Sequence, residues 1–162
     1  MTQTLFIRHS DVTEVGSRRL LEWCLSRGGD AFTLSVIGAA SAVDVTAAAL
    51  FARLDAHRVD VATVKAIPSE GEGSFWTNPG DLWRLDVASV EILLSTFEHG
   101  ILTYYPQHDA WCEDPIVYRS GELLLGIISH EGEGVLRVSA NDVASLVSAR
   151  IPFHREGQWV GY

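Results

Sequence analysis

Apolar and polar positions in the first part of the chain follow two periods, one typical of strands and one typical of helices. Three short apolar runs have the length of strands and cover residues 4–9, 31–38 and 59–67. Between them, apolar residues recur at helical spacing over 18–27, which Ser17 opens, and over 43–57. The predicted order is strand, helix, strand, helix, strand, the pattern of one half of an α/β or α+β domain.

The clearest helical pattern comes after a connection that contains Gly, Pro and Trp. It covers 87–99, Asp86 precedes it as a good N-cap, and Gly100 ends it. The residues of its apolar stripe are Val87, Val90, Leu94 and Phe97. We therefore expect this helix to pack one face against the core.

Four apolar runs follow that lie too close together to leave room for helices between them. They cover residues 101–105, 115–119, 122–129 and 135–138. Ser120 and Gly121 have the size and chemistry of a two-residue hairpin turn, so these strands should be antiparallel neighbours. Ser139, with Asp142 three residues later, resembles a capping box before a closing helix over 143–150.

These patterns predict one α+β domain over residues 1–162. An N-terminal β-α-β-α-β half is followed by a helix, an antiparallel β meander and a short closing helix. Hydrophobic residues make up 47% of the chain and charged residues 20%, which is typical of a compact globular protein. A chain of 162 residues can bury one sizeable core without metal or disulfide staples.

Hydropathy and cysteine content predict a cytoplasmic protein with no membrane contact. No apolar stretch approaches the roughly 18 residues that span a bilayer, and the N-terminus lacks the apolar run of a secretory signal. Disulfide-stapled secreted proteins usually carry more cysteines than Cys24 and Cys112, of which Cys112 is expected in a loop. Only Lys65 among the twelve basic residues is a lysine, which indicates a GC-rich, bacterial genome.

The net charge of −9 is concentrated in one part of the chain. The segment from Ser69 to Glu133 has twelve acids against Arg84 and Arg119 and so carries −10, whereas the rest of the chain sums to +1. This distribution disfavours nucleic acid as a direct partner, because binding to phosphate needs clustered Lys and Arg. A basic protein partner is favoured, and solubility alone is the alternative explanation.

A strand that ends in Arg8 and His9 suggests one kind of catalytic site. The motif resembles the opening of the histidine phosphatase superfamily, where an Arg-His-Gly motif supplies the nucleophilic histidine. GIISHEG, which contains His130 after a late strand, resembles the second histidine of that superfamily. The resemblance implies that His9 attacks phosphorus while Arg8 and His130 hold the phosphate oxygens.

The chain departs from that superfamily in three respects. Ser10 stands where the motif has glycine, and we find no mid-chain segment in which an arginine follows a serine and proline. Glu131 and Glu133 also place negative charge beside the histidine, where a dianion must bind. The simpler interpretation is a surface arginine followed by a strand-end histidine.

A second group of residues contains the ligand types of a divalent metal site. Its members are His108, Asp109, Cys112, Glu113, Asp114, His130, Glu131 and Glu133. Their spacing matches no specific metal motif, since the chain has neither Cys-x-x-Cys nor His-x-x-x-His. The acids that follow Cys112 argue against a reactive thiol. We therefore predict no metal and no cofactor.

The tetrapeptide Glu-Gly-Glu-Gly occurs twice, at 70–73 and at 131–134, each time after an apolar run. The flanking residues differ, so we interpret both copies as flexible acidic turns rather than as a duplication. Large aromatics lie in or beside the acidic segment and comprise Trp76, Trp83, Trp111, Tyr104 and Tyr105. Aromatics ringed by acids suit an interface with a basic partner, and the alternative is that they cover the core.

These observations favour a non-enzymatic cytoplasmic binding protein that acts on a basic protein through an acidic, aromatic-rich half, residues 69–138. The predicted contact residues are Glu70, Glu72, Trp76, Asp109, Trp111, Glu113, Asp114, His130, Glu131 and Glu133. Small immunity proteins, which inhibit basic nuclease toxins, share this size and charge as an analogy and not as a sequence match. The alternative is a small hydrolase, either similar to the histidine phosphatases at Arg8, His9 and His130 or dependent on a metal.

Overall fold

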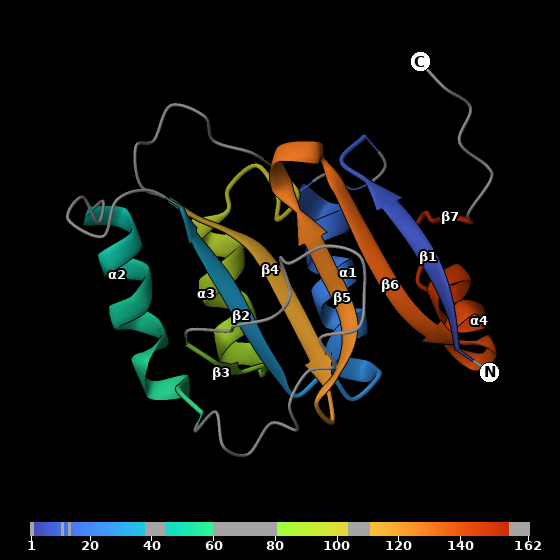
Figure 1. Cartoon of the computed structure of the whole chain (residues 1–162), viewed down its shortest axis with the longest axis horizontal. Coiled ribbons are helices and arrows are strands. Elements are labelled where there is room, and N and C mark those ends of the chain that lie inside the picture. The colour runs from blue at the N-terminus through green and yellow to red at the C-terminus, as the bar shows by residue number, and fades with distance from the viewer. Residues whose placement is uncertain are drawn as a thin grey trace.

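The fold is one antiparallel sheet with helices on one face (Figure 1). The computed structural model describes residues 2–10, 12, 14–37, 45–59, 81–103 and 111–155, with the backbone alone at Glu14, Val36, Ile37, 45–47, Trp111 and Glu113. None of the helices in these ranges combines the length and the hydrophobicity that a membrane span needs.

The sheet has seven strands in the described part of the chain, and every pair of neighbours is antiparallel. The strands are β1 (Thr2–Arg8), β2 (Ala31–Ile37), β3 (Trp83–Arg84), β4 (Trp111–Arg119), β5 (Glu122–Ile128), β6 (Glu133–Ser139) and β7 (His154–Arg155). Their order across the sheet is β3-β2-β4-β5-β6-β1-β7. The strands β4, β5 and β6 follow one another along the chain and are neighbours in the sheet. The last of them, β6, pairs on its other side with the N-terminal strand β1.

The four α-helices placed by the structure pack into the same core on one face of the sheet, and in Figure 1 α2 lies at the left edge while α1, α3 and α4 lie behind the strands. They are α1 (Glu14–Ser26), α2 (Val45–Leu54), α3 (Val87–Thr96) and α4 (Ala140–Ser148), and the 3-10 turns η1 (Asp55–His57) and η4 (Ser129–Glu131) follow α2 and β5. Leu21, Leu50, Leu93 and Leu146, one from each helix, join strand residues in one buried cluster. The elements and their layers confirm the predicted α+β class.

Local capping and turn signals act where the sequence analysis predicts them. The Asp86 carboxylate accepts a hydrogen bond from Ser89 N at 2.9 Å and caps α3, and Ser89 Oγ accepts one from Asp86 N in return. Ser139 and Asp142 form the same reciprocal box at the start of α4. The turn at 120–121 joins β4 to β5 and has positive φ at both residues, 52° and 80°, as tight hairpin turns do.

Two predictions near α1 and α3 are wrong. Residues 101–102 form a buried turn and do not begin the predicted strand over 101–105, whose last two residues lie outside the described ranges. Ile101 N donates a hydrogen bond to the buried hydroxyl of Ser17 at 3.1 Å. Ser17 lies inside α1, which already begins at Glu14, so its hydroxyl supports a distant connection and does not open the helix.

The buried face of α3 also differs from the predicted stripe. Val87 is exposed, whereas Val90, Leu93 and Phe97 are buried and Leu94 is only partly covered. The helix therefore turns a different side toward the sheet from the one predicted, since Ser89 in its first turn is fully buried whereas Val87 is exposed.

Two further predictions concern strands and loops. Cys112 is buried within β4 and does not lie in a loop. The predicted strand over 59–67 lies outside the described residues from 60 onward, and Val59 itself is in no strand. Val59 N donates to Leu82 O at 2.8 Å, next to β3, which is the described neighbour of β2 on this side.

Candidate functional site

The second Glu-Gly-Glu-Gly stretch lies at one end of the sheet, at the top of Figure 1, where β5 leads into β6. Ser129–Glu131 form η4, Gly132 follows with a φ of 66°, and β6 begins at Glu133. Glycine adopts this left-handed conformation without strain, which explains its place at the end of η4. The predicted flexible turn is therefore only partly a turn, because Glu133 and Gly134 belong to a strand.

Asp114 supports this turn from the neighbouring strand β4. Its Oδ1 accepts a hydrogen bond from Ser129 N at 2.6 Å, and its own N–H donates to Ser129 Oγ at 3.3 Å. Asp114 is 7% exposed and has a φ of 52°. Its carboxylate holds the β5–β6 connection and is not displayed to a partner, which corrects its place among the predicted contact residues.

The end of β1 lies against the same turn. His9 N donates to Gly132 O at 2.7 Å, and Arg8 stands opposite Glu133 in the β1–β6 register. Thr103 Oγ1 lies 3.2 Å from Nε2 of His9. The fold thus brings the N-terminal Arg-His motif to the second Glu-Gly-Glu-Gly stretch, although the two are far apart in sequence.

Thr103 is a contact of this site that the sequence analysis misses. Its hydroxyl donates to the His99 carbonyl oxygen at 2.8 Å. A hydroxyl has one proton, so when that bond forms, Nε2 of His9 is the donor toward Thr103 and Nδ1 is the acceptor of the neutral ring. No local signal identifies Thr103, because it lies in the connection after α3 and reaches His9 only through the tertiary fold.

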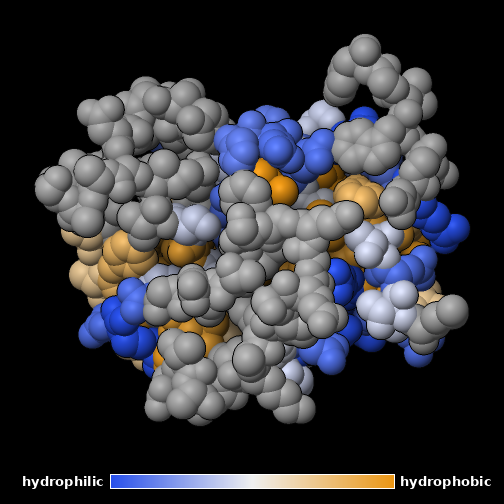
Figure 2. Space-filling view, viewed as in Figure 1, coloured by the Kyte–Doolittle hydropathy of each residue, from blue (hydrophilic) through white to orange (hydrophobic). Residues whose placement is uncertain are grey.

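The charged groups around η4 lie on an exposed surface. The side chains of His130 and Glu131 are 40% and 55% exposed, and His130 Nε2 lies 4.0 Å from Glu131 Oε1. Partial burial and the charge of Glu131 raise the pKa of Glu133, and the charge of Arg8 acts in the opposite direction. Figure 2 shows a hydrophilic patch at the upper edge, where Figure 1 places η4.

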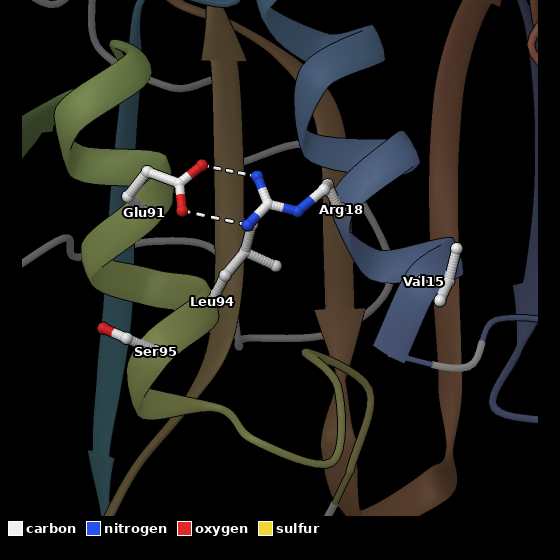
Figure 3. Close-up of a pocket in the computed structure, with 5 residues that line it drawn as sticks. All are labelled: Val15, Arg18, Glu91, Leu94 and Ser95. Atoms are coloured by element: carbon white, nitrogen blue, oxygen red, sulfur yellow. Dashed lines mark hydrogen bonds and ion pairs between the residues drawn. The ribbon is translucent and has the colours of Figure 1, made fainter.

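Three acids elsewhere in the fold, Glu91, Asp81 and Asp55, pair with arginines of the same chain. Arg18 on α1 pairs with both carboxylate oxygens of Glu91 on α3, across the hollow drawn in Figure 3. Arg58 pairs through Nη1 with Oδ1 of Asp81, and its Nε lies 3.3 Å from Oδ1 of Asp55. These carboxylates have less charge to offer to a partner than those around η4.

The candidate metal ligands do not converge in the part of the chain that is described. Within it, no group of three or more His, Cys, Asp or Glu side chains is placed to hold an ion. His108 and Asp109, two of the candidate ligands, lie outside it. Burial raises the pKa of Cys112 to about 12 and also raises that of Cys24, so neither thiol is a ready nucleophile.

The remaining predicted contact residues divide into two groups. Outside the described ranges lie Glu70, Glu72, Trp76 and Asp109. Trp111 and Glu113 belong to β4, where only their backbone is described. His130, Glu131 and Glu133 are therefore the members of the predicted surface whose side chains are placed together.

Comparison of the chain with family models, with curated proteins and with solved structures finds no match.

Proposed function

We propose that the chain is a non-enzymatic protein that binds a basic protein partner through the end of the sheet around η4. This surface, the η4 surface, is defined by His130, Glu131 and Glu133. Lysines and arginines of the partner meet carboxylates on a connection that Asp114 holds in place. Electrostatic attraction of this kind speeds the encounter of two proteins and orients them.

The observation that carries the proposal is the placement of two carboxylates, Glu131 and Glu133, at the same end of the sheet. The side chain of Glu131 is 55% exposed, and Glu133 follows two residues later at the start of β6. Partial burial and the neighbouring carboxylate both raise the pKa of Glu133. A cation supplied by a partner would offset that repulsion and favour the ionised form.

The cysteines and the net charge support a compartment and a class of partner for this proposal. Both cysteines are buried thiols without a disulfide, which fits the reducing cytoplasm of a bacterium. The excess of 21 acids over 12 bases disfavours nucleic acid as the partner. Inhibition of a basic toxin, by analogy with small immunity proteins, is an activity that such a surface would serve.

We expect Glu131→Lys to weaken partner binding by about tenfold at low salt, because it places a cation where the partner's cations dock. Wild-type and variant chains would be immobilised and exposed to lysate of the source organism at increasing salt. We expect the wild-type chain to retain one basic protein at low salt and to release it at high salt. The variant should not retain that protein. Titration calorimetry with that purified protein then measures the change in affinity.

Glu122→Lys is the matched control. Glu122 is exposed at the start of β5, at the opposite end of the strand from η4, and its reversal changes the net charge by the same amount. Equal weakening by both variants would mean that only net charge matters and would contradict a site at η4. Asp114→Lys is unsuitable, because it would bury a cation where Ser129 N–H needs an acceptor.

One observation favours the alternative, a hydrolase at the N-terminal Arg-His motif. The fold brings His9 to the turn that carries His130, with Thr103 against the His9 ring. On this alternative, Nδ1 of His9 attacks phosphorus and Arg8 binds a phosphate oxygen. Hydrolysis of p-nitrophenyl phosphate by the wild type, abolished in His9→Ala, would establish it, whereas a binding protein keeps its partner affinity in that variant.

A further inference from the structure

A hollow of about 260 Å³ lies beside the β4–β5 hairpin turn, at the end of the sheet opposite the η4 surface. Residues that line it include Asp30, Ala31, Val59, Arg84, Tyr118 and Ser120. Its volume is just below the roughly 300 Å³ at which pockets for drug-sized ligands begin. An occupant of this hollow must therefore be a small molecule or group.

The strand register explains why the hollow exists. Ala31 on β2 pairs with Arg84 on β3 and with Tyr118 on β4. The next pair, Phe32 and Trp83, belongs to the core under the helices, so Ala31 and its partners occupy the opposite face. Neighbouring strands lie about 4.8 Å apart, which places Arg84 and Tyr118 about 10 Å from each other across an alanine floor.

Tyr118 contributes a polar group without a partner. The residue is 1% exposed, and its hydroxyl makes no hydrogen bond with the residues that the structure places. Around it lies a small apolar cluster with Ala31, Leu82 and Ile116, separate from the main core. Burial raises the pKa of Tyr118 to about 12, so the phenol keeps its proton at neutral pH. A ligand group that reaches this hydroxyl would gain a hydrogen bond that the fold leaves unmade.

Two opposite charges flank the alanine floor. Arg84 is exposed on β3, and no described carboxylate pairs with its guanidinium. Asp30 lies on the hairpin side, where its Oδ2 accepts a hydrogen bond from Ser120 N at 2.9 Å. The hollow therefore has a cation at one side and an anchored anion at the other, with the apolar Ala31 and Val59 in its lining.

The hollow between α1 and α3 provides a contrast. It has a similar volume, about 240 Å³, but the guanidinium of Arg18 in its lining already donates hydrogen bonds to both carboxylate oxygens of Glu91 (Figure 3). A ligand there would have to break a two-pronged ion pair, whereas Arg84 offers its charge without that cost.

We propose that the hollow beside the hairpin binds a small zwitterion. Its carboxylate pairs with Arg84, its ammonium pairs with Asp30, and its apolar middle lies on Ala31. A simple anion is disfavoured because Asp30 repels it, and a simple cation because Arg84 does. The Asp30 carboxylate lies against Ser120 at the end of β4, and Arg84 lies on β3, with β2 between them. This separation favours a molecule whose charges are several bonds apart over one whose charges sit on adjacent carbons.

Titration with 4-aminobutyrate, followed through backbone amide chemical shifts, tests this proposal. We expect shifts concentrated at Ala31, Arg84 and Ser120. Butyrate and butylamine each lack one charge, and we expect them to bind about threefold to fivefold more weakly, as suits exposed ion pairs. Arg84→Gln should bind 4-aminobutyrate no better than butylamine, and Asp30→Asn should bind it no better than butyrate.

Tyr118→Phe separates ligand binding from folding. Because the hydroxyl lacks a partner, its removal should not lower the urea midpoint of the unliganded chain, but it should lower the affinity for 4-aminobutyrate. Three probes that bind alike, shifts that persist unchanged in both charge variants, or a Tyr118→Phe variant with full affinity and a lower midpoint would each overturn the proposal.

Discussion

Replacing Asp142 by Asn is expected to lower the free energy of unfolding by about 3 kcal/mol. Asp142 is 1% exposed, and its carboxylate accepts hydrogen bonds from Arg27 Nε at 2.8 Å and from the backbone and hydroxyl of Ser139 at 2.8 Å. Arg119 Nη1 lies 3.3 Å away. One carboxylate thus joins the end of α1, β4 and the cap of α4, and the amide of Asn would leave both arginines without a counter-charge.

The same network makes stability depend on pH. Burial alone would raise the pKa of Asp142, but hydrogen bonds from Ser139 and Arg27 and the charge of Arg119 outweigh it and lower the pKa from 3.8 to about 2. The unfolded chain therefore binds this proton at a higher pH than the folded chain does. The carboxylate's contribution, about 2 kcal/mol, is fully present above about pH 4 and is lost as the pH falls through about 2.

Urea unfolding of the wild type and of Asp142→Asn at about pH 7 and about pH 2 measures both effects. The difference in free energy between the two proteins should shrink by about 2 kcal/mol at the lower pH. Glu91→Gln is the control, because it removes only the exposed pair with Arg18 and should cost much less than Asp142→Asn. A difference that is the same at both pH values would contradict the role of the ionised carboxylate.

Replacing Gly134 by Ala is expected to cost about 2 kcal/mol, because the fold leaves no room for a Cβ there. An added methyl would lie 2.6 Å from Ile7 Cγ1, 2.8 Å from Ile7 Cδ1 and 3.4 Å from Gly126 O. Ile7 pairs with Gly134 across β1 and β6 and is fully buried, so it cannot move into solvent. The last glycine of the second Glu-Gly-Glu-Gly stretch is thus required by packing and does not serve flexibility.

A double-mutant cycle with Ile7→Ala identifies the cause of that cost. Ile7→Ala alone should cost about 3 kcal/mol, since it empties a buried site. Gly134→Ala should then cost less in the Ile7→Ala background, because the new methyl fills part of the space. Unfolding of the four proteins in urea gives the coupling, and costs that simply add would argue against a steric origin.

Elements that depend on near neighbours could be predicted from the sequence. The boxes at Asp86 and Ser139 and the turn at 120–121 each satisfy backbone groups within about four residues, so the chemistry of a short window is sufficient. The strands on either side of that turn follow for the same reason, since a two-residue connection permits only an antiparallel pair.

Apolar runs without such signals were ambiguous. Ile101 and Leu102 are apolar and were therefore predicted to lie in a strand. Both are buried, but they form a turn, in which the N–H of Ile101 donates to the Ser17 hydroxyl. A short apolar run predicts that its residues are buried, but it does not predict whether they form a strand, a helix or a turn. Likewise, Val87 is apolar at helical spacing yet exposed, because the side of α3 that faces the core carries Ser89, Val90 and Leu93 instead.

The sequence by itself determined the fold class, the capped helices, the β4–β5 hairpin and the position of the negative charge, because each depends on composition or on residues close in the chain. Only the tertiary structure decided which acids are exposed. Asp114 and Asp142 are buried and accept hydrogen bonds from the protein, whereas Glu131 is exposed at the surface. It also decided that β1 pairs with β6 and brings His9 to Gly132. Contacts between distant segments follow from how the whole sheet closes on one core, and no short stretch of sequence contains that information.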